Sequence, residues 1–225
     1  MDLYPLFNSL RVALISCVIV FFLGIAFAWF TTKLPVLIKG FLDVFFTLPL
    51  VLPPTVIGYF LLRILGPKRI IGSYFFDNFG IKLSMMWYSA IFASVVVAFP
   101  LMYRTARGAF ESIDKNLIYS AQILGLSDIF IFWKIVMPLC RKGITAGAIL
   151  SFARALGEYG ATSMISGYTP QKTATISTTV YQLWRTGNDE LAMKWVLVNI
   201  AISFIVLMAV NILERKKHES FSRYS

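Results

Sequence analysis

Long apolar stretches separated by short polar segments dominate the hydrophobic pattern of this chain. Several of them reach the roughly 20 residues that an α-helix needs to cross the hydrocarbon core of a bilayer. The alternating apolar and polar positions that are typical of barrel strands are not found. The pattern therefore predicts an all-α integral membrane protein, a polytopic bundle with about five transmembrane helices over 12–30, 41–65, 85–103, 144–165 and 195–213.

The composition supports this class of protein. The chain is 58% hydrophobic and 14% charged, whereas a soluble domain carries roughly 25% charged residues. We expect a single transmembrane domain over residues 1–225, with a cytoplasmic loop over about 104–142. No obvious small-residue cleavage site follows the first apolar stretch, so we expect that stretch to be retained as a membrane helix. Cys17 and Cys140 are too few and too separated to indicate a disulfide framework or a CxxC metal site.

The distribution of lysine and arginine predicts the orientation of the chain. The formal net charge is +10, and basic residues gather in three segments that an odd number of spans places on one side. Because cytoplasmic loops are enriched in these residues, we expect the N-terminus outside and the C-terminus in the cytoplasm. The three segments carry Lys33 and Lys39, then Arg104, Arg107, Lys115, Lys134, Arg141 and Lys142, then Arg215, Lys216, Lys217 and Arg223. The opposite side carries Lys68, Arg69, Lys82, Lys172, Arg185 and Lys194.

An amphipathic pattern follows the fourth predicted span. Ile176, Val180, Leu183 and Trp184 recur at helical spacing, with polar residues between them. This spacing predicts a short helix that lies at the outer interface of the membrane or covers a cavity.

A second amphipathic pattern lies in the cytoplasmic loop, over 110–126. Its apolar residues recur at intervals of three and four, and Gly125 ends the pattern as a helix stop. Pro138 is expected to limit any later continuation of the helix. A short helix of this kind can present its tip to a partner protein, or it can be an interfacial connector without a partner. The apolar residues of the pattern are Phe110, Ile113, Leu117, Ala121 and Leu124.

Three prolines interrupt the second predicted span. Pro49, Pro53 and Pro54 remove backbone donors and clash with preceding carbonyl groups, so the helix must be kinked or broken there. Backbone groups freed inside a membrane need protein or water as partners. The segment up to Thr55 is therefore either part of a transport pathway or gate, or a structural kink.

Two ionisable residues lie within the fourth predicted span. A charged group at mid-bilayer costs roughly 3 kcal/mol on insertion scales. Arg154 and Glu158 are four residues apart, which lets them pair on one helix face. Small residues around Glu158 allow another helix to approach closely. The pair either belongs to a gate or fixes a helix contact, and the neighbouring candidates are Gly157, Gly160 and Thr162.

The cytoplasmic loop resembles that of ATP-binding-cassette (ABC) importer permeases, whose pattern is Glu-Ala-Ala, three residues, Gly, nine residues, Ile, one residue, Leu-Pro. Tyr119 and Ser120 stand in place of Glu and the first Ala, and Met137 stands in place of Leu. In that family the loop docks on a separate ATPase subunit. The resemblance therefore implies that ATPase coupling involves Tyr119, Ser120, Ala121, Gly125, Leu126, Ile135 and Pro138.

Three further segments extend the resemblance to the molybdate importer permease family. They are LPLVLPPTVIGY at 48–59, FPL at 99–101 and ARALGEYGAT at 153–162. The resemblance implies a type I importer fold and a homodimer in the inner membrane of a prokaryote, with the substrate path along its two-fold axis. It also implies a cytoplasmic ABC ATPase dimer and an extracytoplasmic oxyanion-binding protein as partners. Pro49, Pro53, Pro54 and Thr55 would then line the path together with the residues around Glu158.

Nucleotide-binding and hydrolytic motifs are missing from the sequence. It contains no G-x-x-x-x-G-K-[ST], HExxH or GxSxG pattern. We therefore expect a transport subunit without a cofactor of its own, with ATP and Mg on the partner ATPase. Tungstate and sulfate or thiosulfate are alternative substrates, and a membrane-embedded scaffold or enzyme that uses Arg154 and Glu158 is the alternative class.

Overall fold

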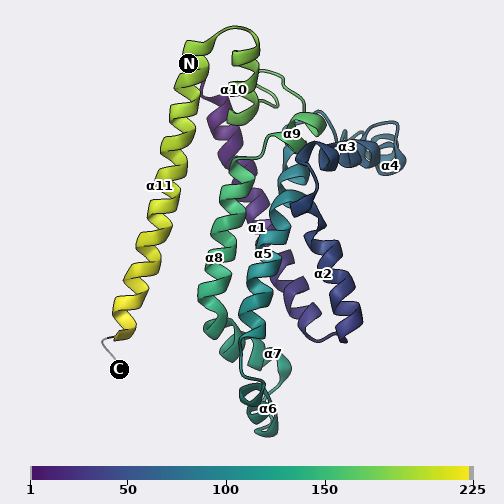
Figure 1. Ribbon diagram of the computed structural model, residues 1–225. Coiled ribbons are helices and arrows are strands. Elements are labelled where there is room, and N and C mark those ends of the chain that lie inside the picture. The colour runs from purple at the N-terminus through teal and green to yellow at the C-terminus, as the bar shows by residue number, and fades with distance from the viewer. Residues whose placement is uncertain (1, 223–225) are drawn as a thin grey trace.

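The computed structural model describes the backbone of residues 2–222 and the side chains of residues 2–208. All regular structure in this part of the chain is helical (Figure 1). The elements are α1 (Tyr4–Thr32), α2 (Val36–Val51), α3 (Pro54–Leu65), α4 (Ile70–Phe79), α5 (Ser89–Glu111), α6 (Lys115–Ile123), α7 (Asp128–Ile131), the π-helical turn η1 (Phe132–Val136), α8 (Met137–Leu156), α9 (Gly160–Ile165), α10 (Ile176–Arg185) and α11 (Asp189–Ser222).

The centre of the molecule is a bundle of α1, α5 and α8. Lipid is as apolar as a leucine side chain, so membrane helices associate mainly through close packing, which small residues permit. Met102 and Tyr103 are fully buried where α5 meets α1. The small buried residues are Ser9, Ala13, Ser16, Gly24 and Ala28 of α1 and Ser89, Ala90, Ala93, Ser94, Ala98 and Ala106 of α5.

The predicted number of spans agrees with the structure when a broken pair of helices is taken as one crossing. Four helical segments are long and apolar enough to cross a membrane: Tyr4–Thr32, Ser89–Glu111, Asp128–Leu156 and Asp189–Met208. The fifth crossing is the pair α2 and α3, which is bent by 109°. The predicted all-α membrane fold is therefore confirmed.

The fourth span begins earlier than the sequence indicated. Its helix starts at Asp128, so the apolar residues that follow α6 and its turn are its first turns. The expectation that Pro138 limits the helix was wrong, because Pro138 occupies the second position of α8, directly after η1. In this wider turn the Met137 N–H bonds to the Phe132 carbonyl. The π turn thus adjusts the hydrogen-bond pattern beside a residue that has no donor of its own.

The predicted helix after the fourth span is α10, which lies beside the start of α1 and of α11 (Figure 1). Thr175 caps it through a reciprocal pair of hydrogen bonds with Thr178. Two polar side chains of α1 fix its position: Ser9 Oγ accepts from Ile176 N at 2.8 Å, and Asn8 Nδ2 donates to Ala174 O at 3.0 Å. The helix therefore packs on the bundle through its buried first turn.

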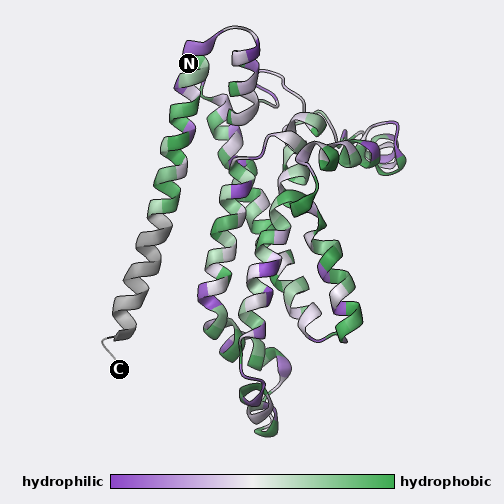
Figure 2. Cartoon of the chain, viewed as in Figure 1, coloured by the Kyte–Doolittle hydropathy of each residue, from purple (hydrophilic) through white to green (hydrophobic). Residues whose placement is uncertain are grey.

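Helix α11 stands apart from the bundle over most of its length (Figure 1). Figure 2 shows that apolar residues dominate the described part of this helix. Leu197, Ile200 and Phe204 are each more than half exposed. Arg223 lies outside the described residues, as do the side chains of Arg215, Lys216 and Lys217. An apolar helix with this exposure fits a lipid environment.

Candidate gate and coupling site

Two interrupted helices pack against each other and bring the two predicted pathway segments together. Helix α3 lies on α9, near the beginning of α5 (Figure 1). A Cβ atom placed on Gly160 would lie 2.9 Å from Pro54 Cβ and 3.3 Å from Thr55 N. Only glycine permits this approach without a shift of the backbone. Pro54, Thr55 and Gly160 therefore form one contact.

The proline segment contains a break, as predicted, and it lies at Leu52 and Pro53. Pro49 is accommodated inside α2. Leu52 has an extended conformation with ψ 138°, which is the conformation that a following proline favours. Pro53 is the N-cap of α3, and its carbonyl accepts from Val56 N at 2.9 Å. The pair of helices turns through 109° at this point.

The predicted ion pair is present, with Arg154 Nη1 at 2.6 Å from Glu158 Oε2. The expectation that both residues lie on one continuous helix was wrong. Helix α8 ends at Leu156, Glu158 lies in the break, and α9 begins at Gly160. The other carboxylate oxygen, Oε1, accepts from Ala161 N at 2.7 Å. The Glu158 side chain is 1% exposed and that of Arg154 is 31% exposed.

A negative charge next to the first N–H groups of a helix is favourable because those groups have no partner within the helix. Glu158 therefore satisfies the start of α9 and the guanidinium of Arg154 at the same time. Gly157, which is exposed, and Thr162, which is buried, flank this arrangement. The carboxylate holds the end of one helix and the beginning of the next together.

The segment expected to couple to an ATPase comprises α6 and the turn at Gly125, and we call it the coupling segment. It lies at the opposite end of the bundle (Figure 1). Asp114 caps α6 by accepting from Asn116 N at 2.9 Å. Gly125 has φ +77°, a left-handed conformation that glycine adopts without strain, and it ends the helix as predicted. Ile123 and Leu124 precede it and are 86% and 79% exposed. An exposed apolar tip therefore projects from the molecule.

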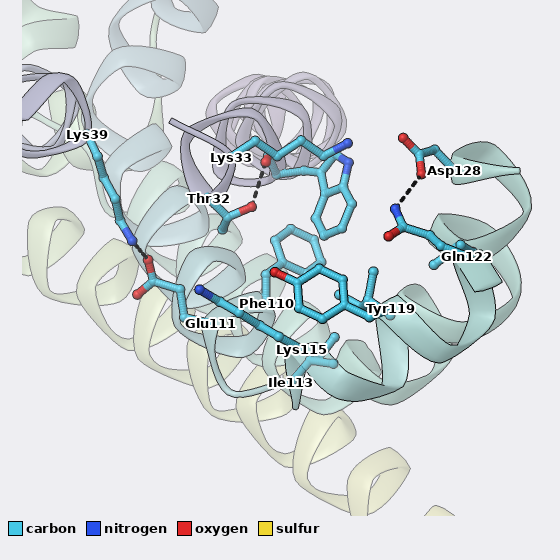
Figure 3. Close-up of a pocket in the computed structure, with 13 residues that line it drawn as sticks. Thr32, Lys33, Lys39, Phe110, Glu111, Ile113, Lys115, Tyr119, Gln122 and Asp128 are labelled. Carbon is cyan, nitrogen blue, oxygen red and sulfur yellow. Dashed lines mark hydrogen bonds and ion pairs between the residues drawn. The ribbon is translucent and has the colours of Figure 1, made fainter. Parts of the chain in front are cut away.

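A pocket of about 550 Å³ lies between this segment and the end of α1 (Figure 3). Aromatic side chains form part of its wall, and the ammonium group of Lys33 lies 4.8 Å from the centre of the Trp29 ring. Gln122 Nε2 donates to Asp128 Oδ1 at 3.1 Å, which ties α6 to α7. The pocket is lined by Trp29, Thr32, Lys33, Lys39, Phe110, Glu111, Ile113, Lys115, Ile118, Tyr119, Gln122, Asp128 and Ile131.

A family model described as binding-protein-dependent transport system inner membrane component matches residues 20–218. The chain belongs to this family.

Individual relatives narrow the assignment of this permease. It is 39% identical over 215 residues to the putative molybdenum transport system permease protein YvgM of Bacillus subtilis (strain 168), which covers 95% of this chain and 93% of that protein. It is 38% identical over 216 residues to the molybdenum transport system permease protein ModB of Escherichia coli (strain K12), which covers 96% of this chain and 94% of that protein. The predicted membership in the molybdate importer permease family is confirmed.

The fold of the permease is also similar to a solved structure. The match is to a bacterial ABC transporter involved in the import of the acidic polysaccharide alginate, with a TM-score of 0.78 and 18% identity over 95% of this chain and 79% of that chain. This likeness agrees with the predicted importer-permease fold.

The predicted coupling residues of the permease do not form one surface. Tyr119 and Ser120 are exposed on α6, and the half-buried Leu126 follows Gly125 in the turn. Ala121 is 5% exposed and packs on the bundle, so it faces the permease itself. Ile135 lies in η1 and Pro138 in α8, both within the next span.

The prediction of a single amphipathic helix over 110–126 was wrong in the extent of that helix. Phe110 belongs to α5, and α6 begins only at Lys115. The bend between the two helices changes the register of the buried face. As a result Leu117 and Leu124, which were expected on that face, are 44% and 79% exposed.

Sequence reasoning missed a charged cluster on α2 and α5. Asp43 of α2 pairs with Arg107 of α5, and Lys39 pairs with Glu111, the last residue of α5. The hydroxyl group of Tyr103 donates to Asp43. Asp43 could have been found, because an acidic residue within an apolar span requires a partner.

The exposed side of the break in α2 and α3 can be tested by labelling. Val51 is 82% exposed and Thr55 is also exposed. In a background in which Cys17 and Cys140 are replaced by serine, we expect cysteine at Val51 or Thr55 to react with a water-soluble thiol reagent more strongly in one nucleotide state than in the other. Ile57→Cys, a 5% exposed position on the same helix as Thr55, is the matched control. If neither test position reacts in any state, the segment is a buried structural kink.

Proposed function

We propose that this chain is the permease subunit of an ABC importer that moves molybdate into the cell, driven by ATP hydrolysis on a separate subunit. The observation that carries the proposal is the 38–39% identity to molybdenum transport permeases along nearly the whole chain. The proposal has two parts, the role of the chain in transport and molybdate as the oxyanion that is transported.

The arrangement of the chain supports a role as the membrane subunit, with ATP hydrolysis on a separate ATPase subunit. An exposed apolar tip at Ile123 and Leu124 projects beyond the bundle, where a soluble subunit can bind it. The tip is connected to α5 and, through α7, to α8. Movement of the tip therefore acts on two of the three central helices. Nucleotide and Mg would be bound on the ATPase, and this chain would hold no cofactor.

Basic residues support a plasma-membrane orientation with the coupling tip in the cytoplasm. Lys33, Lys39 and Lys115 line the pocket beside α6, at one end of the bundle. The first residues of α1 lie at the other end, next to α10 (Figure 1). By the positive-inside rule, the N-terminus is outside and the C-terminus is cytoplasmic. The complete importer would contain two copies of this chain, two ATPase subunits and an extracytoplasmic oxyanion-binding protein.

Reconstitution tests this function. The permease would be purified with its ATPase, incorporated into liposomes and supplied with the binding protein on the outer side. We expect uptake of molybdate that depends on ATP inside and on the binding protein outside. Competition with tungstate and with sulfate then defines the substrate. Uptake of sulfate but not of molybdate would refute the proposed substrate, and a chain that never copurifies with an ATPase would refute the transport role.

A further inference from the structure

Helix α2 is weakly held by the rest of the molecule. Among the described side chains, α2 carries none that is buried. It lies along α5 and makes little contact with α1, mainly through the rings of Phe46 and Phe27, whose centres are 5.0 Å apart. Its main apolar anchor is Phe46, whose ring lies 5.1 Å from that of Tyr103 and 5.5 Å from that of Phe99. Polar side chains of α2 make further connections to α5.

The polar connections form one network at the cytoplasmic end of the bundle. Asp43 accepts from Tyr103 and pairs with Arg107, whose Nε lies 3.1 Å from Glu111 Oε1. Glu111 also pairs with Lys39, one turn before Asp43 on α2. The network therefore joins two successive turns of α2 to three successive turns of α5.

These ion pairs differ from ordinary surface pairs in their surroundings. Between 22% and 34% of each charged side chain is exposed, and Tyr103 is fully buried beneath them. Charges attract more strongly in such surroundings than in water. A surface pair, by contrast, contributes little. The exposed pair of Lys194 and Glu190 provides that comparison within the same chain.

The network connects the two parts of the candidate site, which are the coupling segment and the break between α2 and α3. Glu111 is the last residue of α5, and α6 follows after 112–114. At the other end, α2 reaches the break at Leu52 and Pro53. Beyond the break, α3 packs mainly on α9 and to a smaller extent on α5. The half-helices on either side of the break are thus fixed to different parts of the molecule.

We infer that Asp43 and Arg107 are positioning residues for the gate, because their pair makes α2 move together with the end of α5 and with α6. A displacement of the coupling segment then changes the angle between α2 and α3, with Leu52 and Pro53 as the hinge. The inference rests on the proposed transport function. It adds a specific route by which ATPase motion reaches the membrane pathway.

The coupling between ATP hydrolysis and uptake tests the inference. In liposomes that contain the permease, ATPase and binding protein, we expect Asp43→Asn and Arg107→Gln each to lower molybdate uptake by about tenfold, within the range that coupling between sites typically spans. ATP hydrolysis by the assembled complex should fall much less, so that more ATP is consumed per molybdate ion imported. The exchanged pair, Asp43→Arg with Arg107→Asp, should recover part of the coupling.

Assembly is measured first by gel filtration with the ATPase, and Glu190→Gln is the matched control for loss of an ion pair. If Asp43→Asn fails to assemble, Tyr103→Phe is the second variant. It leaves both charges in place, removes the hydrogen bonds of the Tyr103 hydroxyl group to Asp43 and Thr31, and should raise the ATP consumed per ion more modestly. Normal coupling in the assembled variants would overturn the inference. So would equal losses of uptake and hydrolysis in every variant, since that is the result of a structural role alone. Absence of ATP-dependent uptake in the unmodified importer would instead refute the proposed function.

Discussion

Arg154→Ala is expected to reduce the stability of the assembled permease by about 3–5 kcal/mol, the cost of leaving one member of a buried ion pair without its partner. The reason lies in the unequal burial of the two residues. Glu158 is 1% exposed and cannot reach water, whereas Arg154 is 31% exposed. Loss of the guanidinium therefore leaves a buried carboxylate that keeps the hydrogen bond from the Ala161 N–H but has lost its ion-pair partner.

Substitution of the other partner, Glu158→Gln, should reduce stability less than Arg154→Ala does. A comparison of the two variants is therefore informative. Glu158→Gln retains an oxygen that can accept from Ala161 N, and the partly exposed Arg154 can be hydrated. Folded yield and thermal unfolding in detergent, together with uptake in liposomes, measure stability and function separately. A Glu158→Gln variant that assembles and transports normally would exclude a gating role and leave a structural pair. A variant that assembles but leaks or transports poorly would support the gate.

Gly125→Pro is expected to abolish coupled uptake, since proline cannot adopt the φ of +77° that ends α6. Ile123→Arg should have a similar effect for a different reason. Ile123 is 86% exposed, so the substitution leaves the packing of the permease unchanged and alters only the surface offered to the ATPase. Copurification of the ATPase and ATP-dependent uptake are the measurements.

Controls for this surface follow from exposure. Ile70→Arg makes the same substitution at an 88% exposed position of α4, away from the coupling segment, and should preserve uptake. Ala121→Arg is unsuitable as a test of docking, because Ala121 is 5% exposed and the substitution would disrupt the permease itself. Normal assembly and uptake with both Gly125→Pro and Ile123→Arg would show that α6 is a connector without a partner.

Features that depend on one residue type or on local periodicity could be predicted from the sequence. Apolar length indicated the spans, three prolines indicated the break, and the spacing of Arg154 and Glu158 indicated their pair. Gly125 was identified as a helix stop because few other residues adopt that conformation.

Features that depend on tertiary contacts could not be predicted in the same way. At the break between α8 and α9, the Glu158 carboxylate accepts a hydrogen bond from the first turn of α9. The hydrophobic periodicity of the sequence does not indicate this contact. The inward direction of Ala121 follows from the bend between α5 and α6. The partners of Asp43 come from α5, about sixty positions away, and only the folded bundle brings them together.

The break after α2 also changes how this crossing fits its membrane. The 16 residues of α2 rise by about 24 Å at about 1.5 Å per residue, whereas the hydrocarbon core of a bilayer is about 30 Å thick. Helix α3 then turns away by 109° and extends sideways from the bundle toward α4 (Figure 1). The crossing is therefore short for its lipid surroundings, and such mismatch is relieved by thinning of the bilayer or by tilting of the helix. We therefore expect the acyl-chain length of the surrounding lipid to influence the angle between α2 and α3 at Leu52 and Pro53.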